Sequence, residues 1–318
     1  MLKKLFATAL AAAALIATSA SAQDYPSKPI KLIVPYGAGG GSDSLARAIQ
    51  AAIEKYDLMP EPLVIVNVDA GGGVVGAREG KNAKPDGYTF LQAHNEIFPL
   101  ALSGRLGFEV LDGLQPVAQT TTACNYLAVP ASSQFQSFDE VTAFAKENPG
   151  DLKLADLIGG LSHYGLVAAL KDQGVDIGIV QTGGTSARFA SLKGGHTDLA
   201  VMSPGWIERG GDELRGLLWL GDDVPEYAGD MPTAKSAGLD IVGCLNRRYW
   251  APKGTPQEAI DYFAGVLEKA LDTPELKEFH AKSFANINFQ TGDALMSGIQ
   301  DEVEKFTAAA ANVDLSGQ

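Results

Sequence analysis

The chain has 318 residues, of which 46% are hydrophobic, 8% aromatic and 20% charged, and this composition suits one large globular domain or two smaller ones. Lys and Arg number 25 against 38 Asp and Glu, so the formal net charge is -13. Because the sequence contains no basic stripe to bind a phosphate backbone, nucleic acid is not expected as a partner.

The first residues of the chain are typical of a bacterial signal peptide. Lys3 and Lys4 precede an apolar stretch at residues 5–17, and residues 20–22 form a cleavage site of the A-x-A kind. The apolar stretch is shorter than the roughly 20 residues that span a membrane. We therefore expect cleavage after Ala22 and a periplasmic mature protein. Because residues 1–22 contain two lysines and no acid, the mature protein would have a net charge of -15.

Strands and helices are expected to alternate along the first third of the mature chain. Ser42 or Asp43 is placed to cap the first helix, because side-chain oxygens at this position accept hydrogen bonds from free helix amides. This alternation predicts a parallel, doubly wound sheet rather than a sandwich. The expected strands are residues 30–34, 63–66 and 88–91, with glycine-rich loops at 37–41 and 71–73 and helices after each loop.

A second α/β series of similar size begins near Pro116. No low-complexity linker separates the two series, so we expect two lobes joined by ordered crossovers. The expected strands are residues 117–120, 126–129, 178–181 and 199–201, and the expected helices are 138–147, 162–173, one that ends at 192, 257–271 and 292–313.

The glycine loop at residues 37–41 follows a strand and opens a helix. Backbone amides and the helix dipole make this arrangement suitable for binding an anion. A nucleotide P-loop would need Lys after its last glycine, and a dinucleotide fingerprint would need glycine where Ser42 stands. A simple tight turn remains an alternative. Similar loops at 71–73, 159–160 and 183–184 favour a ligand site, because all would lie near the carboxyl ends of strands.

Evidence for catalysis in the sequence is thin. Residues 160–164 resemble a nucleophile elbow, but Tyr164 stands where the last glycine is needed. His163 is better interpreted as a cap or packing residue at the start of a helix. The histidines are scattered without metal-ligand spacing, so no metal and no cofactor are expected. An exported α/β cleft enzyme, such as a carboxylester hydrolase, stays as the alternative function.

Four segments, taken together and in order, resemble a known family. They are residues 25–30 (YPSKPI), 34–47 (VPYGAGGGSDSLAR), 85–89 (PDGYT) and 251–256 (APKGTP). With them, the chain from residue 25 to 318 resembles the solute-binding proteins of tripartite tricarboxylate transporters, the Bug family. The resemblance implies a periplasmic binding protein without enzymatic activity, which holds a small organic acid between two lobes. This acid would be a di- or tricarboxylate or a related compound.

The resemblance also implies an α/β fold of the type II Venus flytrap kind, in which each lobe is a mainly parallel sheet flanked by helices. The first lobe would comprise residues 23–122 and 247–318, and the second residues 123–246. Such a protein is expected to act as a monomer and to deliver its ligand to membrane permease subunits. A signalling role, in which the loaded protein contacts a sensor instead, is an open alternative.

Loops from both lobes would surround the ligand, and one carboxylate would contact backbone amides and ordered water. The chain departs from the family pattern at Leu157, Gly160 and Thr182, in the distal part of this site. The residues implied as ligand-binding are Tyr36, Ala38, Gly39, Gly40, Ser42, Asp43, Asn67, Gly71, Gly72 and Gly73 in the first lobe, and Gly159, Gly160, Ser162, Thr182, Gly184, Thr185 and Asp198 in the second.

Three arginines and two cysteines leave alternatives open. Arg188, Arg247 and Arg248 could each pair with a second carboxylate of the ligand or could be solvated at the surface. Cys124 and Cys244 fall on the expected crossovers between the lobes. An exported protein permits a disulfide there, and two buried thiols are the alternative.

Overall fold

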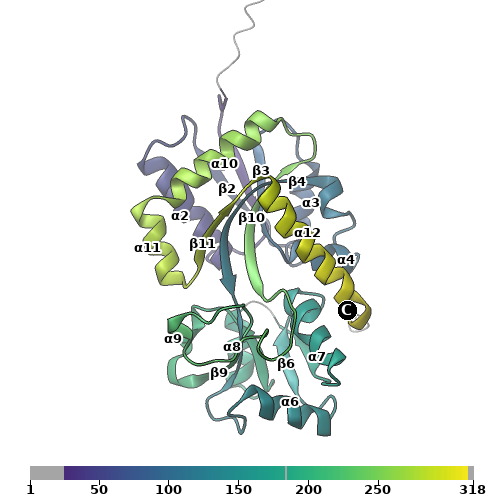
Figure 1. Cartoon of the computed structure of the whole chain (residues 1–318). Coiled ribbons are helices and arrows are strands. Elements are labelled where there is room, and N and C mark those ends of the chain that lie inside the picture. Colours follow the sequence, from purple (N-terminus) through teal and green to yellow (C-terminus); the bar gives the residue numbers. More distant parts are fainter. Residues whose placement is uncertain (1–24, 183–184, 314–318) are drawn as a thin grey trace, which may run out of the picture.

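The computed structural model describes residues 25–182 and 185–313. The expected signal peptide, residues 1–22, and Gly184 therefore lie outside the described residues. Figure 1 shows two stacked lobes, each built on one β-sheet with helices packed against it. The expected α/β fold with two lobes is thus confirmed.

The larger lobe contains a six-stranded sheet. In this sheet β1 pairs in parallel with β2 and β3, whereas the pairs β3–β10, β10–β4 and β4–β11 are antiparallel. The sheet is mixed rather than mainly parallel, because β4 carries the chain out of this lobe and β10 brings it back. Its strands, in spatial order, are β11 (Asn286–Gln290), β4 (Leu114–Cys124), β10 (Cys244–Pro252), β3 (Thr89–His94), β1 (Ile30–Val34) and β2 (Leu63–Asn67).

Two apolar clusters hold helices against the two faces of this sheet. One cluster contains Leu45, Ile49 and Phe263, and the other contains Phe98 and Phe306. Burial of each of these large side chains contributes about 1.5 to 3 kcal/mol. The first face carries α2 (Gly41–Lys55), α10 (Gln257–Leu271) and α11 (Pro274–Ser283), and the second carries α3 (Val74–Asn82), α4 (Ile97–Leu102) and α12 (Gly292–Ala309); the short helix α5 (Val110–Gly113) precedes β4.

The smaller lobe contains a five-stranded sheet, which is also mixed. In it β6 is parallel to β7 and β8, and β5 is antiparallel to β8 and β9. In spatial order the strands are β7 (Gly178–Gln181), β6 (Lys153–Asp156), β8 (Leu199–Met202), β5 (Tyr126–Pro130) and β9 (Leu214–Trp219), and the helices are α6 (Phe138–Glu147), α7 (Ala168–Asp172), α8 (Thr185–Lys193) and α9 (Trp206–Gly210).

Several elements begin and end as predicted, namely β1, α6, β7 and α10. The residue that caps α2 is Gly40, so Ser42 and Asp43 lie inside its first turn, contrary to expectation. The predicted helix 162–173 is divided into a π-helical segment, His163–Val167, and α7. Strands β6, β9, β10 and β11 and helices α4, α5, α9 and α11 were not predicted. β6 has only four residues, too few to establish a period, whereas β11 alternates polar and apolar residues and its pattern was overlooked.

The strands β4 and β10 lie side by side where the chain passes between the lobes (Figure 1). Cys124 is directly opposite Cys244 in this pair, and the two form a disulfide with a Cα–Cα separation of 3.8 Å. The alternative of two buried thiols is therefore wrong. The proposed lobe boundaries, after residues 122 and 246, fall beside this disulfide. No helix in the described part of the chain is long and apolar enough to cross a membrane.

Candidate functional site

Two glycine loops of the larger lobe lie next to each other. The strands β1 and β2 are parallel, so both carboxyl ends lie at one edge of the sheet, and each strand leads through a loop into a helix. A Cβ on Gly73 would lie 2.9 Å from the Pro35 carbonyl oxygen and 3.7 Å from the Tyr36 ring. The starts of α2 and α3 are therefore brought together, as the sequence predicts for the ends of parallel strands.

Asp43 holds the first loop in shape. Its Oδ2 accepts hydrogen bonds from the Gly39 amide at 2.8 Å and from Arg47 Nε at 2.9 Å, and its Oδ1 accepts one from Asn67 at 2.9 Å. Burial raises the pKa of Asp43, but the hydrogen bonds from Arg47, Gly39 and Asn67 outweigh it and lower the pKa below its ordinary value. The carboxylate of Asp43 is therefore occupied by protein donors.

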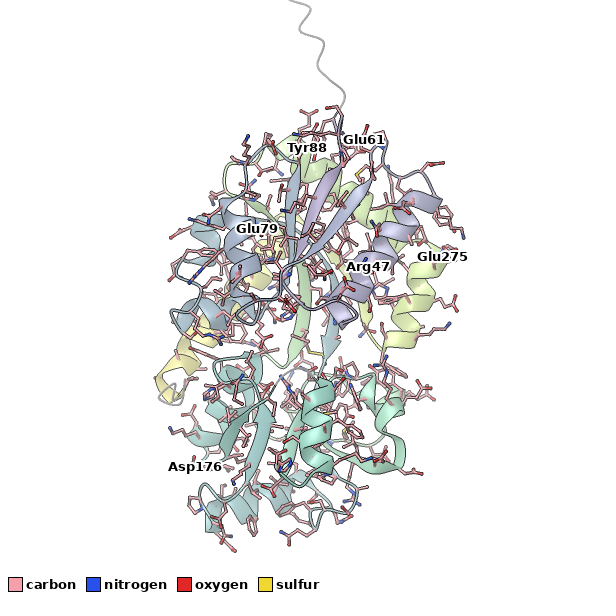
Figure 2. The ribbon with its side chains drawn as sticks, turned by 180° about the vertical axis from the view of Figure 1, so that it is seen from behind. Arg47, Glu61, Glu79, Tyr88, Asp176 and Glu275 are labelled. Carbon is pink, nitrogen blue, oxygen red and sulfur yellow. A yellow bond between two sulfur atoms is a disulfide. The ribbon has the colours of Figure 1, made fainter. Side chains whose placement is uncertain are left out.

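Asn67 has the same positioning role. Its Nδ2 donates to the Tyr36 carbonyl at 3.0 Å as well as to Asp43, and its Oδ1 accepts from Arg47 at 3.1 Å. Arg47, labelled in Figure 2, lies on α2 in the larger lobe with about half of its side chain exposed. Asp43 and Asn67 were expected to contact the ligand, whereas the structure directs their polar atoms to the loop itself.

Free backbone donors remain at the starts of both helices. Within the described residues, the amides of 41–43 and of 71–74 have no hydrogen-bond acceptor. Gly71, Gly72 and Gly73 have φ values of 67, 67 and 93°, which glycine adopts at little cost and which turn this backbone toward the start of α3. Amides at helix starts lack partners within the helix and carry partial positive charge. This edge of the sheet can therefore bind an anion.

The predicted loops of the smaller lobe follow β6 and β7. The Gly159 amide donates to His163 Nδ1 at 2.9 Å, so the buried His163 holds the preceding loop and is not the cap of the helix. The Gly160 amide donates to the Leu157 carbonyl at 2.9 Å, and the Thr182 amide donates to the backbone carbonyl of Asp156 at 2.8 Å. These amides are engaged within their own loops. Ser162 is buried directly before the π-helical segment, and Thr185 begins α8.

Asp198 lies at the opposite edge of the smaller sheet. It precedes β8, and its Oδ2 accepts a hydrogen bond from the amide of Lys153, the first residue of β6, at 2.9 Å. Because β6 and β8 are parallel, this edge is the one where the strands start, whereas Gly159 and Thr182 follow strand ends. The structure does not bring Asp198 to the other predicted site residues.

Glu96 connects the two lobes at the ends of these strands. Its Oε1 accepts a hydrogen bond from the Leu161 amide at 3.5 Å, and a Cβ on Gly160 would lie 2.7 Å from the same oxygen. Burial raises the pKa of Glu96, and the charge of Arg188 only partly counteracts this. Sequence reasoning missed Glu96. Its position two residues after β3, a neighbour of β1, was the available signal.

His94 and Tyr36 form an aromatic pair beside Glu96. Their rings stack with centroids 4.4 Å apart and planes 8° apart, and His94 Nε2 lies 3.7 Å from Glu96 Oε2. Burial, together with the charge of Arg247, lowers the pKa of His94 to about 3. His94 is therefore a neutral imidazole at neutral pH, so it supplies no positive charge here.

The three arginines have different roles. Arg188 pairs with Asp156 at 2.8 Å, and Arg248 pairs with Glu302 at 2.6 Å. Both side chains are largely buried, so surface solvation does not describe these two arginines. Arg247 differs, because one of its terminal nitrogens lies 3.2 Å from the Cβ position of Gly41, at the start of α2.

The described residues also form a cavity of about 590 Å³ in the smaller lobe. It is lined mainly by apolar side chains, including Tyr126, Trp206, Leu217 and Met231. None of the residues predicted to bind the ligand lines it. In the described ranges, no group of three or more His, Cys, Asp or Glu side chains is placed to hold a metal ion.

A sequence profile described as "Tripartite tricarboxylate transporter family receptor" matches residues 45–315 of the chain. A UPF0065 protein of Bordetella pertussis is similar to the chain, with 30% identity over 313 residues, 96% of this chain and 95% of the relative.

Solved structures share the fold. A TctC solute-binding protein from Polaromonas, at 25% identity, has a TM-score of 0.73 and aligns with 90% of this chain and 98% of its own. MatC of Rhodopseudomonas palustris, with bound malate, has a TM-score of 0.76 at 22% identity over 90% of this chain and 100% of its own. R. palustris Rpa4515, with adipate, has a TM-score of 0.77 at 21% identity and aligns with 92% of this chain and 100% of its own.

Proposed function

Since this chain belongs to the tripartite tricarboxylate transporter receptor family, whose members are periplasmic solute-binding receptors and not enzymes, we propose that it captures a small carboxylate between its lobes. The ligand is a di- or tricarboxylate or a related organic acid. The loaded protein delivers it to the membrane permease of a tripartite tricarboxylate transporter. The hydrolase alternative does not agree with the family.

The observation that carries this proposal is the pair of helix starts with free amides in the larger lobe. A carboxylate placed there would accept several short hydrogen bonds from amides 41–43 and 71–74. Malate and adipate, present in two proteins of the same fold, are both dicarboxylates. The proposed contacts are Tyr36, Ala38, Gly39, Gly40, Ser42, Gly71, Gly72 and Gly73, with Gly159, Gly160, Ser162, Thr182 and Thr185 from the smaller lobe.

In this proposal Asp43 and Asn67 position the first glycine loop and do not contact the ligand. Asp198 is not included, because it lies at the opposite end of the strands. The proposal includes export with cleavage after Ala22, and two lobes formed by residues 23–122 with 247–318 and by residues 123–246. A monomer is sufficient, because both lobes come from one chain. Contact of the loaded protein with a sensor would use the same ligand site.

Thermal unfolding with a panel of free acids tests the proposal. A ligand at about 100 times its Kd adds ~2.7 kcal/mol to the free energy of unfolding, which corresponds to a shift of roughly 5 to 10 °C. Malate, adipate, succinate, citrate and benzoate form a suitable panel. The absence of any shift, together with the absence of a bound acid in native mass spectrometry, would contradict the proposal.

The variant Gly40→Val tests the first loop. Gly40 has φ of -74°, which valine adopts, although its Cβ would lie 3.2 Å from the Gly37 carbonyl oxygen and the loop must shift slightly. The valine side chain would cover the start of α2. We expect calorimetry to detect no binding in a folded Gly40→Val protein. Gly265→Val is the matched control, because a Cβ at this position in α10 meets no atom within 4 Å. Wild-type affinity in Gly40→Val would exclude this loop from the site.

A further inference from the structure

Arg247 lies in β10, where the chain returns to the larger lobe. It is directly opposite His94 of β3, and directly opposite residues of an antiparallel pair point to the same face of a sheet. A terminal nitrogen of its guanidinium lies 3.2 Å from the Cβ position of Gly41, the first residue of α2. The guanidinium is therefore packed against the helix start that presents the free amides of residues 41–43.

No acid among the described residues compensates the charge of Arg247. Its Nε is buried and has no hydrogen-bond partner in this part of the chain, and the ion pairs of the other two arginines use Asp156 and Glu302. The titratable groups that face Arg247 are neutral, because burial raises the pKa of the tyrosines and lowers the pKa of the histidines. These groups are Tyr36, His94, Tyr249 and His280.

Two sources of positive potential thus meet, and the acid in the first turn of α2, Asp43, is already engaged by Gly39, Arg47 and Asn67. The start of a helix carries a partial positive charge, and an adjacent guanidinium repels it. Arg247 is partly buried, and a charge withdrawn from water without a partner is unfavourable, which is also why burial lowers the pKa of Arg247 itself. A carboxylate at the start of α2 would remove both problems, because it could accept hydrogen bonds from the amides and the guanidinium together.

We propose that Arg247 binds the carboxylate of the ligand directly. This inference rests on the proposed function and defines its ligand more closely: the group at the start of α2 must be an ionised acid, and uncharged analogues such as primary amides are rejected. The family resemblance implies recognition by backbone amides and ordered water, to which Arg247 adds a side-chain cation. Arg188 and Arg248 are instead neutralised by Asp156 and Glu302 within the protein.

The test compares Arg247→Met, Arg247→Lys and the control Arg209→Met. Arg209 is exposed on α9 of the smaller lobe, and its replacement changes the net charge equally. The probe is each acid of the malate, adipate, succinate, citrate and benzoate panel that the wild type binds. We expect Arg247→Met to weaken its binding about 30-fold or more in calorimetry, because an interfacial charge loses its partner. Arg247→Lys should recover part of the loss and Arg209→Met should bind normally.

A second measurement separates binding from a structural role. Without ligand, Arg247→Met should melt no lower than the wild type, because it removes a partly buried charge that has no ion-pair partner among the described residues. A structural arginine would lower the melting temperature instead. A drop in the melting temperature of the free protein, or equal affinity of Arg247→Met and wild type, would overturn the inference.

The inference and the proposed function can fail separately. If no acid of the panel binds the wild type, the proposed function fails and the role of Arg247 fails with it. If an acid binds wild type and Arg247→Met equally well, the carboxylate-binding function stands and only the role of Arg247 is wrong. If the diamide of adipic acid binds the wild type as tightly as adipate, the required charge at the start of α2 is wrong.

Discussion

The carboxylate of Glu96 in the larger lobe accepts a hydrogen bond from the Leu161 amide of the smaller lobe. Leu161 belongs to the loop after β6, one of the loops that the family resemblance assigns to the ligand. The Leu161 amide of this loop is therefore already bound by a carboxylate of the protein, that of Glu96. Glu96 is partly buried where the two lobes meet, so we expect its protonation to influence stability.

We expect Glu96→Gln to make stability less dependent on pH. Burial raises the pKa of Glu96 above its ordinary 4.5, so the folded protein binds this proton more tightly than the unfolded chain. The stabilisation from the bound proton is complete below the ordinary pKa and is lost as pH rises through the raised one. Urea unfolding at several pH values above 4.5 should show a smaller decrease in Glu96→Gln than in wild type. Parallel decreases would contradict this role.

We expect Asp43→Ala to release the first glycine loop. The change leaves the Gly39 amide and the Asn67 side chain without their acceptor, at a cost of about 2 kcal/mol in the free energy of unfolding. Hydrogen exchange of the Gly39 amide should become faster, and urea unfolding should shift to lower concentration. Ser44→Ala, one residue further along α2, is the control. Unchanged protection of Gly39 would argue against the role of Asp43.

The low pKa of Asp43 has a consequence at acid pH. Its stabilisation is present above the ordinary value of 3.8 and is lost as pH falls through the lowered native pKa. The stability difference between wild type and Asp43→Ala should therefore shrink in strongly acidic solution. Urea titrations of both proteins at descending pH measure this difference, and a constant difference would show that the charge of Asp43 is not involved.

Removal of the disulfide by the double change Cys124→Ala and Cys244→Ala should lower the free energy of unfolding. The two cysteines are 120 residues apart, and closing a loop of this size contributes up to about 4.7 kcal/mol. Affinity for the ligand should stay the same, because β4 and β10 remain paired. Urea unfolding and calorimetry measure the two effects. Two alkylated thiols in non-reduced periplasmic protein would show that the bridge does not form.

The buried pair of Arg248 and Glu302 should behave as one unit. The guanidinium donates to both carboxylate oxygens, at 2.6 and 3.0 Å, and links β10 to α12. Arg248→Met alone leaves a buried carboxylate unpaired and should cost about 3 to 5 kcal/mol. The double variant Arg248→Met and Glu302→Leu should be more stable than Arg248→Met alone. With the single variant Glu302→Leu, these proteins complete a double-mutant cycle, and additive losses would mean that the two side chains do not depend on each other.

Local patterns determined much of the fold in advance. The apolar run at residues 30–34 and the amphipathic stretch at residues 257–271 form β1 and α10 with the predicted bounds, because propensity and periodicity act within a few residues. β6 was missed because its four residues are too few to establish a period, and β11 was missed although it alternates polar and apolar residues. Their strand character comes from neighbours that are distant in the sequence.

The sequence by itself determined the family, the two-lobed α/β fold and the positions of the glycine loops, since each depends on residues that are close together in the chain. The tertiary structure alone decided which charged and sulfur groups meet. It joined Cys124 to Cys244, left Arg247 without an acid among the described residues, and placed Asp198 at the far edge of its sheet. These outcomes depend on strand order and direction, which bring together residues far apart in the chain and which no local pattern specifies.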